Sequence, residues 1–182
     1  MIDPHNLSVI VQGAIDPKLT PLCLQSVRTY LPGAEIILST WEGSTIDGLD
    51  YDTLVLNRDP GGKKCDFIYN STNNTNRQLV SIQGGLQKVS RPYCLKLRSD
   101  ALLKGAGFLS YWDRFPARDP EYTLLEHKIL VGSVYSRESA CSGGTGFPTP
   151  FHPSDIWLMG LTQDVRAYFS DTVLMPDLDL AN

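Results

Sequence analysis

The stretch Y-C-L-K-L-R-S-D, residues 93–100, has the alternating pattern of a β-strand and ends in a carboxylate. Successive side chains on a strand point to opposite faces, so Lys96, Arg98 and Asp100 share one face and the apolar residues between them share the other. Strands inside an α/β domain are usually apolar on both faces, because helices cover them. Three charges at the end of such a strand therefore indicate a ligand site beside the sheet.

Strand-like and helix-like segments alternate along the rest of the chain. Besides 93–100, strands are expected at 7–12, 34–40, 53–57 and 129–135. Helices are expected from an N-cap at Thr20 to Leu31, from the polar segment 69–77 to Pro92, from Ser154 or Asp155 through Leu161, and after Thr162. This alternation predicts an α/β fold with a mostly parallel central sheet and helices on both faces. No linker divides the chain, so residues 1–182 are expected to form a single domain.

Composition and charge narrow the class of protein. The chain has 182 residues, 42% hydrophobic and 20% charged, which is ordinary for a soluble globular protein. A net charge of -4 gives no reason to expect a nucleic-acid partner. No apolar run approaches the roughly 20 residues that span a bilayer, and the N-terminus does not resemble a signal peptide. The four cysteines lack zinc-site spacing, so we interpret them as free thiols, which favours the cytoplasm.

Polar residues follow the carboxyl ends of the expected parallel strands. Gln12-Gly13 follows the first strand, Trp41-Glu42 the second, 57–59 the third, and Asp100 ends the stretch at 93–100. In open α/β sheets, ligands bind at the carboxyl ends of the strands. These groups are therefore expected to face one ligand site.

Several longer blocks of the chain point to a family. The blocks are V-Q-G-A-I-D-P (11–17), L-P-G-A-E-I-I-L-S-T-W-E-G (31–43), N-R-Q (76–78), L-K-L-R-S-D (95–100) and P-T-P-F-H-P-S-D-I-W (148–157). Together they resemble the WavE lipopolysaccharide-synthesis family over nearly the whole chain. The resemblance implies a GT-A-like nucleotide-sugar-binding domain. Family members tend to run past residue 182, which leaves open that a C-terminal portion is missing.

The resemblance implies a glycosyltransferase that moves a sugar from a nucleotide-sugar donor to lipopolysaccharide or another surface polysaccharide. Such enzymes usually bind the donor diphosphate through Mn²⁺ or Mg²⁺ and a D-x-D-like motif. The matching position here reads R-S-D, so Asp100 matches the last acid and Arg98 replaces the first. Lys96 and Arg98 can contact pyrophosphate or form structural ion pairs. His152 is a second candidate metal ligand, or simply a loop histidine.

The other donor-site candidates also have structural alternatives. Gln12 and Gly13 are expected to bring the backbone close to the nucleoside, although glycine can simply form the turn. Glu42 can accept hydrogen bonds from ribose hydroxyls. Arg77 lies at the start of a helix that, in enzymes of this type, often reaches over the donor. The sequence therefore predicts a donor site made by residues from four separate segments.

Asp155 is the candidate catalytic base. It opens an expected helix within the proline- and aromatic-rich block 148–157. The later segments of GT-A folds typically build the acceptor side, where a base deprotonates the acceptor hydroxyl. The structural alternative for Asp155 is a cap at the N-terminus of that helix.

Two other functional classes remain open. A catalytically inactive nucleotide- or glycan-binding module is compatible with the presence of R-S-D in place of the D-x-D motif. A nucleotidyltransferase would favour a glycine-rich signature such as G-x-G-T-x-R near the first strand, which V-Q-G-A-I-D-P (11–17) does not match. The expected partners are a nucleotide-sugar donor and a glycan or glycolipid acceptor, without nucleic acid and without a transmembrane segment. Peripheral contact with the inner face of the membrane is compatible with this assignment.

Overall fold

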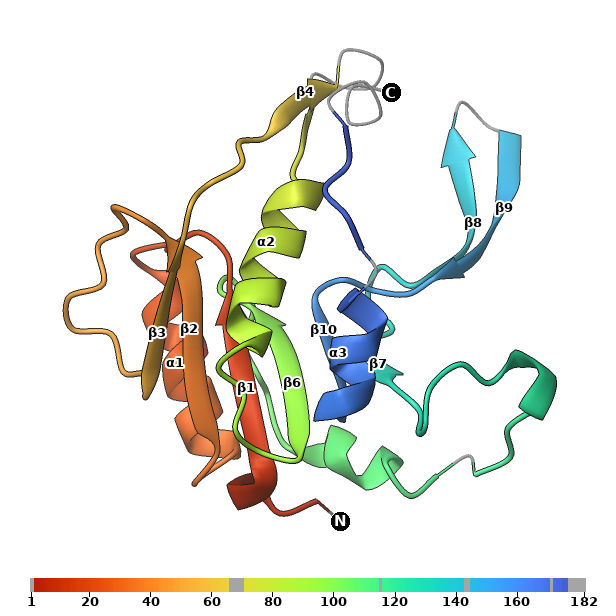
Figure 1. Cartoon of the computed structure of the whole chain (residues 1–182), viewed down its shortest axis with the longest axis horizontal. Helices are drawn as coiled ribbons and strands as arrows, with labels where there is room; N and C mark the ends of the chain where they lie inside the picture. The colour runs from red at the N-terminus through yellow and green to blue at the C-terminus, as the bar shows by residue number, and fades with distance from the viewer. Residues whose placement is uncertain (1, 66–70, 115, 143–144, 171, 177–182) are drawn as a thin grey trace.

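A six-stranded sheet in the order β3-β2-β1-β6-β10-β7 forms the centre of the computed structural model (Figure 1). Its strands are β1 (Leu7–Gln12), β2 (Glu35–Trp41), β3 (Thr53–Asn57), β6 (Tyr93–Arg98), β7 (Leu130–Val131) and β10 (Trp157–Leu161). The strands β3, β2, β1 and β6 are parallel, while β10 pairs antiparallel with both β6 and β7. The structure describes residues 2–65, 71–114, 116–142, 145–170 and 172–176, and their side chains except at 65, 71 and 137–152.

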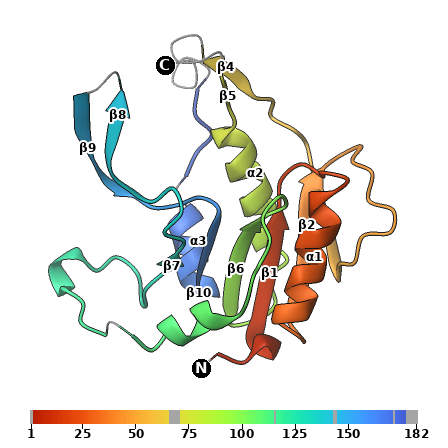
Figure 2. The same cartoon turned by 180° about the vertical axis from the view of Figure 1, so that it is seen from behind.

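Helices cover both faces of this sheet, as Figures 1 and 2 show from opposite sides. The helix α1 (Leu19–Tyr30) packs on one face, and α2 (Thr75–Leu86) and α3 (Thr162–Ser170) pack on the other. Short 3-10 turns occur at η1 (Pro4–Asn6), η2 (Gly107–Tyr111) and η3 (Pro120–Tyr122). The expected α/β fold with a mostly parallel sheet and helices on both faces is confirmed.

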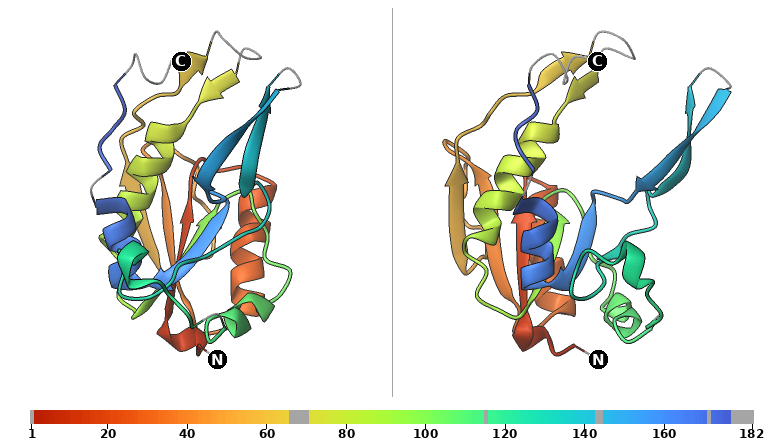
Figure 3. Two further views of the ribbon diagram at one scale, coloured as in Figure 1. Left: turned by 90° about the vertical axis from the view of Figure 1, so that its right-hand side faces the viewer. Right: turned by 45° about the vertical axis from the view of Figure 1, so that its right-hand side comes forward.

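Two hairpins lie outside the central sheet. They are β4 (Lys63–Cys65) with β5 (Ser71–Asn73), and β8 (Arg137–Ser142) with β9 (Thr145–His152), each antiparallel. Figure 3 shows the β8–β9 hairpin extending away from the sheet and its helices. Since α2 follows directly after β5, the first hairpin lies next to the N-terminus of that helix.

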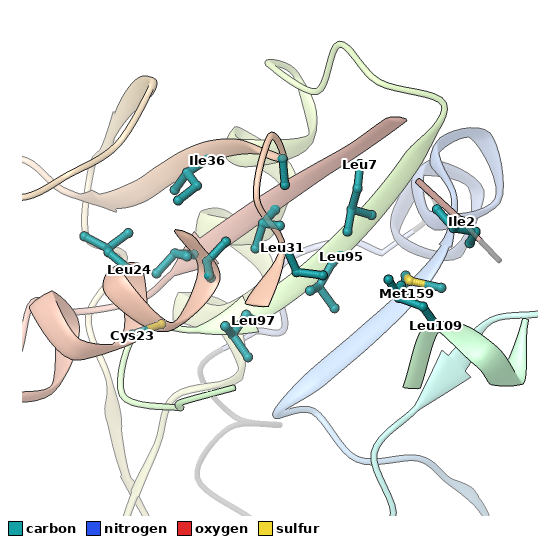
Figure 4. Close-up of a cluster of buried hydrophobic side chains, with 14 of the residues drawn as sticks. Ile2, Leu7, Cys23, Leu24, Leu31, Ile36, Leu95, Leu97, Leu109 and Met159 are labelled. Atoms are coloured by element: carbon teal, nitrogen blue, oxygen red, sulfur yellow. The ribbon is translucent and has the colours of Figure 1, made fainter. Parts of the chain in front are cut away.

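The larger part of the core lies between α1 and the sheet (Figure 4). Leu95 and Leu97 of β6 are almost fully buried there, together with Leu24 of α1 and Ile36 of β2. Burying a side chain of this size is worth roughly 1.5–3 kcal/mol relative to leaving it exposed. This face of the sheet is therefore a principal source of stability.

A second cluster fills the space beneath α2 and α3. Ile10, Ile37 and Ile82 are buried in it. A Cβ atom on Gly85 of α2 would lie 2.5 Å from Cγ2 of Ile10, so the absence of a side chain at this position lets the helix approach the sheet. Glycine is used here for close packing of helix on strand.

The segment after Asp155 is a strand, which contradicts the helix expected there. Residues 157–161 form β10, with Leu158 opposite Lys96 of β6. A five-residue apolar run fits a buried strand or a helix, and periodicity alone does not separate them. Hydrogen bonding to strands on both sides favours the strand. Asp155 therefore lies in the turn before a strand, and the helix-cap alternative for it was wrong.

The expected N-cap at Thr20 is also corrected. Helix α1 begins at Leu19, and Oδ1 of Asp16 accepts hydrogen bonds from the N–H groups of Lys18 and Leu19, each at 2.8 Å. The hydroxyl of Thr20 in turn accepts a bond from the N–H of Asp16 at 3.0 Å. The carboxylate of Asp16, which lies before the helix, therefore satisfies its first donors.

Two other expected elements are longer than the elements observed. Helix α2 ends at Leu86 instead of reaching Pro92, shortly after the pair Gly84-Gly85, and glycine is a weak helix former. The strand expected at 129–135 is reduced to the two residues of β7, because the chain leaves the sheet at Gly132. A helix does begin at Thr162, as expected.

The buried cysteines Cys23 and Cys94 are free thiols. Burial raises the pKa of each thiol to about 12, so neither is a reactive thiolate near neutral pH. The side chains of Cys65 and Cys141 lie outside the described residues. Within the described part of the chain, no helix combines the length and the apolar character needed to cross a bilayer.

Candidate functional site

A cavity of about 580 Å³ lies at the carboxyl edge of the parallel strands. Most of the expected donor-site residues line it: Gln12, Gly13, Arg77, Arg98 and Asp100. They come from the ends of β1 and β6 and from the first turn of α2, and the topology of parallel strands brings them to one edge. We call this space the main cavity.

The floor of the main cavity is held by buried polar groups after β1. Gln12 is 2% exposed, and its Oε1 accepts a hydrogen bond from the hydroxyl of Ser81 on α2 at 3.0 Å. Gly13 has a φ of 120°, in the region that favours glycine, and its N–H donates to the carbonyl of Ser39 at 3.0 Å. These contacts fix the turn between β1 and α1 at the cavity wall.

Arg98 and Asp100 form a two-bond ion pair on this cavity. Nε and Nη2 of Arg98 lie 3.0 and 2.6 Å from the two carboxylate oxygens of Asp100. The hydrogen bond to Arg98 lowers the pKa of Asp100, and the same bond raises the pKa of Arg98. In the structure, Arg98 and Asp100 therefore form the ion pair that was expected as the structural alternative.

Arg77 forms a second pair of the same kind with Asp59. Nε and Nη2 of Arg77 each lie 2.8 Å from an oxygen of Asp59, and Nη1 donates to Oδ1 of Asn74 at 3.0 Å. The hydrogen bond to Arg77 lowers the pKa of Asp59. Asp59 belongs to the polar residues 57–59 that were expected at this edge of the sheet, but no specific role was assigned to it.

Lys96 and Asp155 belong to a different space. They line a smaller cavity of about 120 Å³ between the sheet, α2 and α3, which shares Gln12 and Gln78 with the main cavity. Lys96 is 3% exposed, and its amine donates to the backbone carbonyl of Asp155. Burial lowers the pKa of Lys96 to about 8. Lys96 does not line the main cavity, so the structure does not place it beside a diphosphate there.

One expected residue, Glu42, lines neither cavity, and the side chain of a second, His152, is not described. Glu42 is exposed in the turn after β2 and does not line the main cavity, whereas its neighbour Trp41 does. The backbone of His152 pairs with Arg137 in the β8–β9 hairpin, but its side chain lies outside the described residues. The candidate metal role of His152 therefore stays a prediction.

The described residues do not build a metal site from protein groups alone. They contain no cluster of three or more His, Cys, Asp or Glu side chains that could hold an ion. Asp59 and Asp100 line the main cavity, but each is paired with an arginine. A divalent cation would thus fit here only with further oxygen ligands from a bound molecule, as Mg²⁺ commonly has.

Two arginine–carboxylate pairs therefore line the main cavity, together with a third carboxylate, that of Asp16. The side chains of these pairs are between 35% and 42% exposed. Exposed ion pairs of this kind are worth roughly 0–1 kcal/mol, since water competes for both partners. The arrangement can bind an anionic group through the arginines at little cost in protein stability.

Comparisons with known proteins concern the fold and the family. No curated protein matches the chain in sequence. Among solved structures, 4-diphosphocytidyl-2C-methyl-D-erythritol synthase from Anaerococcus prevotii DSM 20548 is similar, with a TM-score of 0.54 and 14% identity over 98% of this chain and 83% of that chain. At this identity the likeness concerns the fold alone. The family profile for WavE lipopolysaccharide synthesis matches residues 7–181, and the protein belongs to that family.

Proposed function

We propose that the protein is a glycosyltransferase with a GT-A-like fold, which transfers a sugar from a nucleotide-sugar donor to lipopolysaccharide or another surface polysaccharide. The observation that carries the proposal is the main cavity at the carboxyl edge of the sheet, with Arg77 and Arg98 on its walls. Open α/β sheets bind ligands at this edge. Membership of the WavE family and a fold shared with an enzyme named for a diphosphocytidyl compound support this proposal.

The arginines are proposed to bind the donor diphosphate. A guanidinium forms two parallel N–H···O bonds with a phosphate as it does with a carboxylate. In the structure, Arg77 and Arg98 direct these bonds to Asp59 and Asp100. A diphosphate would therefore bind by exchanging with these carboxylates.

Such an exchange would leave carboxylates next to the phosphate oxygens. Mg²⁺ usually binds one or two carboxylates together with substrate phosphates. We propose that Asp100 and the phosphate oxygens hold a Mg²⁺ or Mn²⁺ ion, which would neutralise charge on the leaving diphosphate. Gln12 and Gly13 would then contact the nucleoside from the end of β1.

Asp155 is proposed as the base that deprotonates the acceptor hydroxyl. It lines the smaller cavity, which adjoins the main cavity through Gln12 and Gln78. General-base assistance is typically worth about 10²–10⁴-fold in rate. Asp155→Asn should therefore remove most transfer and leave nucleotide affinity close to that of the native protein.

The experiment that tests the proposal is a thermal-shift panel of the nucleoside diphosphates of uridine, cytidine, guanosine and adenosine, each with and without Mn²⁺. A ligand that binds the native state raises the apparent Tm by mass action. We expect one nucleotide to raise Tm more with Mn²⁺ than without it, and Asp100→Asn to remove that dependence. If no nucleotide stabilised the protein under either condition, the proposal would fail.

An inactive nucleotide-binding module is the second candidate. The observation that favours it is the pairing of Arg98 with Asp100, since a D-x-D motif would leave its acids free for metal. Donor hydrolysis separates the two candidates. The enzyme should release free sugar from the nucleotide sugar whose diphosphate binds, whereas an inactive module would bind the same nucleotide without turnover.

A further inference from the structure

We infer that the smaller cavity is a subsite for the acylamino group of an amino sugar, with Lys96 as the donor to its carbonyl oxygen. The cavity lies between α2, α3 and the carboxyl ends of β1 and β6. The inference rests on the proposed function, because it assigns a class of sugar to the proposed transferase. Three features of the cavity wall support it: a buried amine, an apolar surface and two amide side chains.

Lys96 supplies the hydrogen-bond donor. A protonated amine has three N–H groups. Within the described part of the chain, the hydrogen-bond acceptor of Lys96 is the backbone oxygen of Asp155, which leaves two N–H groups for a ligand. Since buried donors are nearly always satisfied, an acceptor oxygen is expected in the cavity.

The wall next to Lys96 is apolar. Ile82 of α2 and Leu158 of β10 are 1% and 4% exposed, and both line the cavity. A ligand that offered only polar atoms would leave this surface without an apolar contact. A methyl group joined to a carbonyl satisfies both the apolar wall and the amine.

The two glutamines shared by the cavities supply the remaining polar groups. A primary amide both donates and accepts hydrogen bonds, so Gln12 or Gln78 can accept the N–H of an acylamino group. Because both glutamines also line the main cavity, a sugar held there can extend its substituent between them. The donor, the acceptor and the apolar wall together match an amide with a methyl group.

Charge favours this neutral group over a carboxylate. Asp155 lines the same cavity and already opposes the charge of Lys96, so no anionic ligand is needed, and a carboxylate would be repelled. The volume of about 120 Å³ corresponds to roughly four waters at about 30 Å³ each. This space is large enough to hold an acetamido group.

The test is saturation-transfer NMR with methyl glycosides of the 2-acetamido sugars of the gluco, galacto and manno series, and with their parent hexoses. With the native protein, we expect the acetyl methyl protons of at least one acetamido sugar to receive the strongest saturation. Its affinity should exceed that of the parent hexose by about tenfold, the effect of one hydrogen bond to a charged group. Lys96→Met should abolish this preference.

The matched control is Lys88→Met, because Lys88 is exposed and lies just after the C-terminal end of α2. It should keep the preference for the acetamido sugar. Leu79→Phe, at a half-buried position on the cavity wall, should fill the space and also remove the preference. Lys96→Met removes a buried charge, so we expect it to fold.

The inference would be overturned by equal binding of acetamido sugars and parent hexoses, by no saturation of any acetyl methyl group, or by an unchanged preference in Lys96→Met. Tighter binding of methyl glucuronide than of every acetamido sugar would assign the cavity to an anion and would also overturn it. Nucleoside diphosphate binding is measured on the same samples. If that binding persists while the acetamido preference is absent, the inference fails and the proposed function stands.

Discussion

The two faces of the central sheet differ in chemistry, although the same strands build both. Toward α1, β6 presents Leu95 and Leu97 to an apolar core. Toward α2, the same strand presents Cys94, Lys96 and Arg98, and its side chains become charged as the carboxyl edge is approached. Because strand side chains alternate with a period of two, one strand can stabilise the fold on one face and carry a site on the other.

This difference teaches that the candidate functional groups lie on one face and one edge of the sheet. The α1 face can be changed only at a cost in folding, since its contacts are between apolar atoms. The α2 face contains groups that are unfavourable or neutral for stability, such as a buried amine and half-exposed ion pairs. Substitutions on the two faces should therefore alter different measured quantities.

The largest effect on stability is expected from Leu95→Ala on the α1 face. Leu95 is fully buried, and a Leu→Ala change in such a core costs about 2–5 kcal/mol. Urea denaturation should show a lower midpoint with an unchanged m value. Leu124→Ala is the matched control, because Leu124 is 95% exposed and should stay within about 0.5 kcal/mol of the native protein. Equal effects of the two substitutions would contradict the assignment of Leu95 to the core on the α1 face.

On the α2 face, Lys96→Met should stabilise the protein at pH 7. Burial lowers the pKa of Lys96 from 10.5 to about 8, so charging the amine in the folded state costs roughly 3 kcal/mol at about 1.4 kcal/mol for each pKa unit. Methionine has a similar length and no charge to bury. The free energy of unfolding from urea titrations should rise by up to this amount.

The pH dependence of this gain has a definite sign. Below pH 8, Lys96 is protonated in both states and the cost of burying its charge is fully present. Between pH 8 and 10.5 the unfolded chain binds the extra proton, so the native protein gains stability as the pH rises. The advantage of Lys96→Met should therefore shrink across this window. An advantage that stayed constant from pH 7 to 10 would show that charge burial is not its cause.

A smaller effect, on binding and not on folding, is expected from Arg98→Met. A hydrogen bond to a charged group is worth about 1.5–3 kcal/mol, so nucleoside diphosphate affinity should fall by roughly 10- to 100-fold. Stability should change by no more than about 1 kcal/mol, because the pair with Asp100 is partly exposed. Isothermal titration with the diphosphate and with the bare nucleoside distinguishes lost phosphate contacts from a damaged fold.

Arg28→Met is the control for this substitution. Arg28 also forms two-bond pairs with carboxylates, those of Asp50 and Asp52, but it lies near the start of β3, away from the carboxyl edge. It should leave diphosphate affinity unchanged. If both arginine substitutions weakened binding equally, net charge and not the main cavity would determine affinity.

The sequence was sufficient to predict the parallel half of the sheet, but not its antiparallel edge. The strands at 7–12 and 53–57 are apolar runs with clear polar ends, and periodicity identifies them. The run at 157–161 is equally apolar, and only its pairing with β6 and β7 makes it a strand. Tertiary hydrogen bonding, which local pattern does not contain, determined the outcome at this edge.

The candidate site was also predictable only in part. Strand ends placed Gln12, Arg98 and Asp100 at one edge, because parallel topology follows from the alternation of strands and helices. The pairing of Arg77 with Asp59 joins α2 to the chain after β3, and nothing in the local sequence indicates it. The position of Lys96 in a second cavity likewise depends on how α2, α3 and β10 enclose it.

The smallest effect is expected at Asp16, where the two regions meet. Asp16 lines the main cavity, yet its Oδ1 accepts the N–H groups of Lys18 and Leu19 at the start of α1. The bonds from Leu19 and Lys18 lower the pKa of this carboxyl. We assign Asp16 to the structural region, because its hydrogen bonds hold the helix of the α1 face.

Two substitutions test that assignment. Asparagine is also a good N-cap, so Asp16→Asn should keep the Tm nearly unchanged, while Asp16→Ala should lower it by roughly 2–4 °C. Neither should change the Mn²⁺ dependence of diphosphate binding, because the proposed metal ligand is Asp100. Loss of that dependence in Asp16→Asn, with Tm intact, would move Asp16 to the binding region. The binding region would then extend to the segment just before α1.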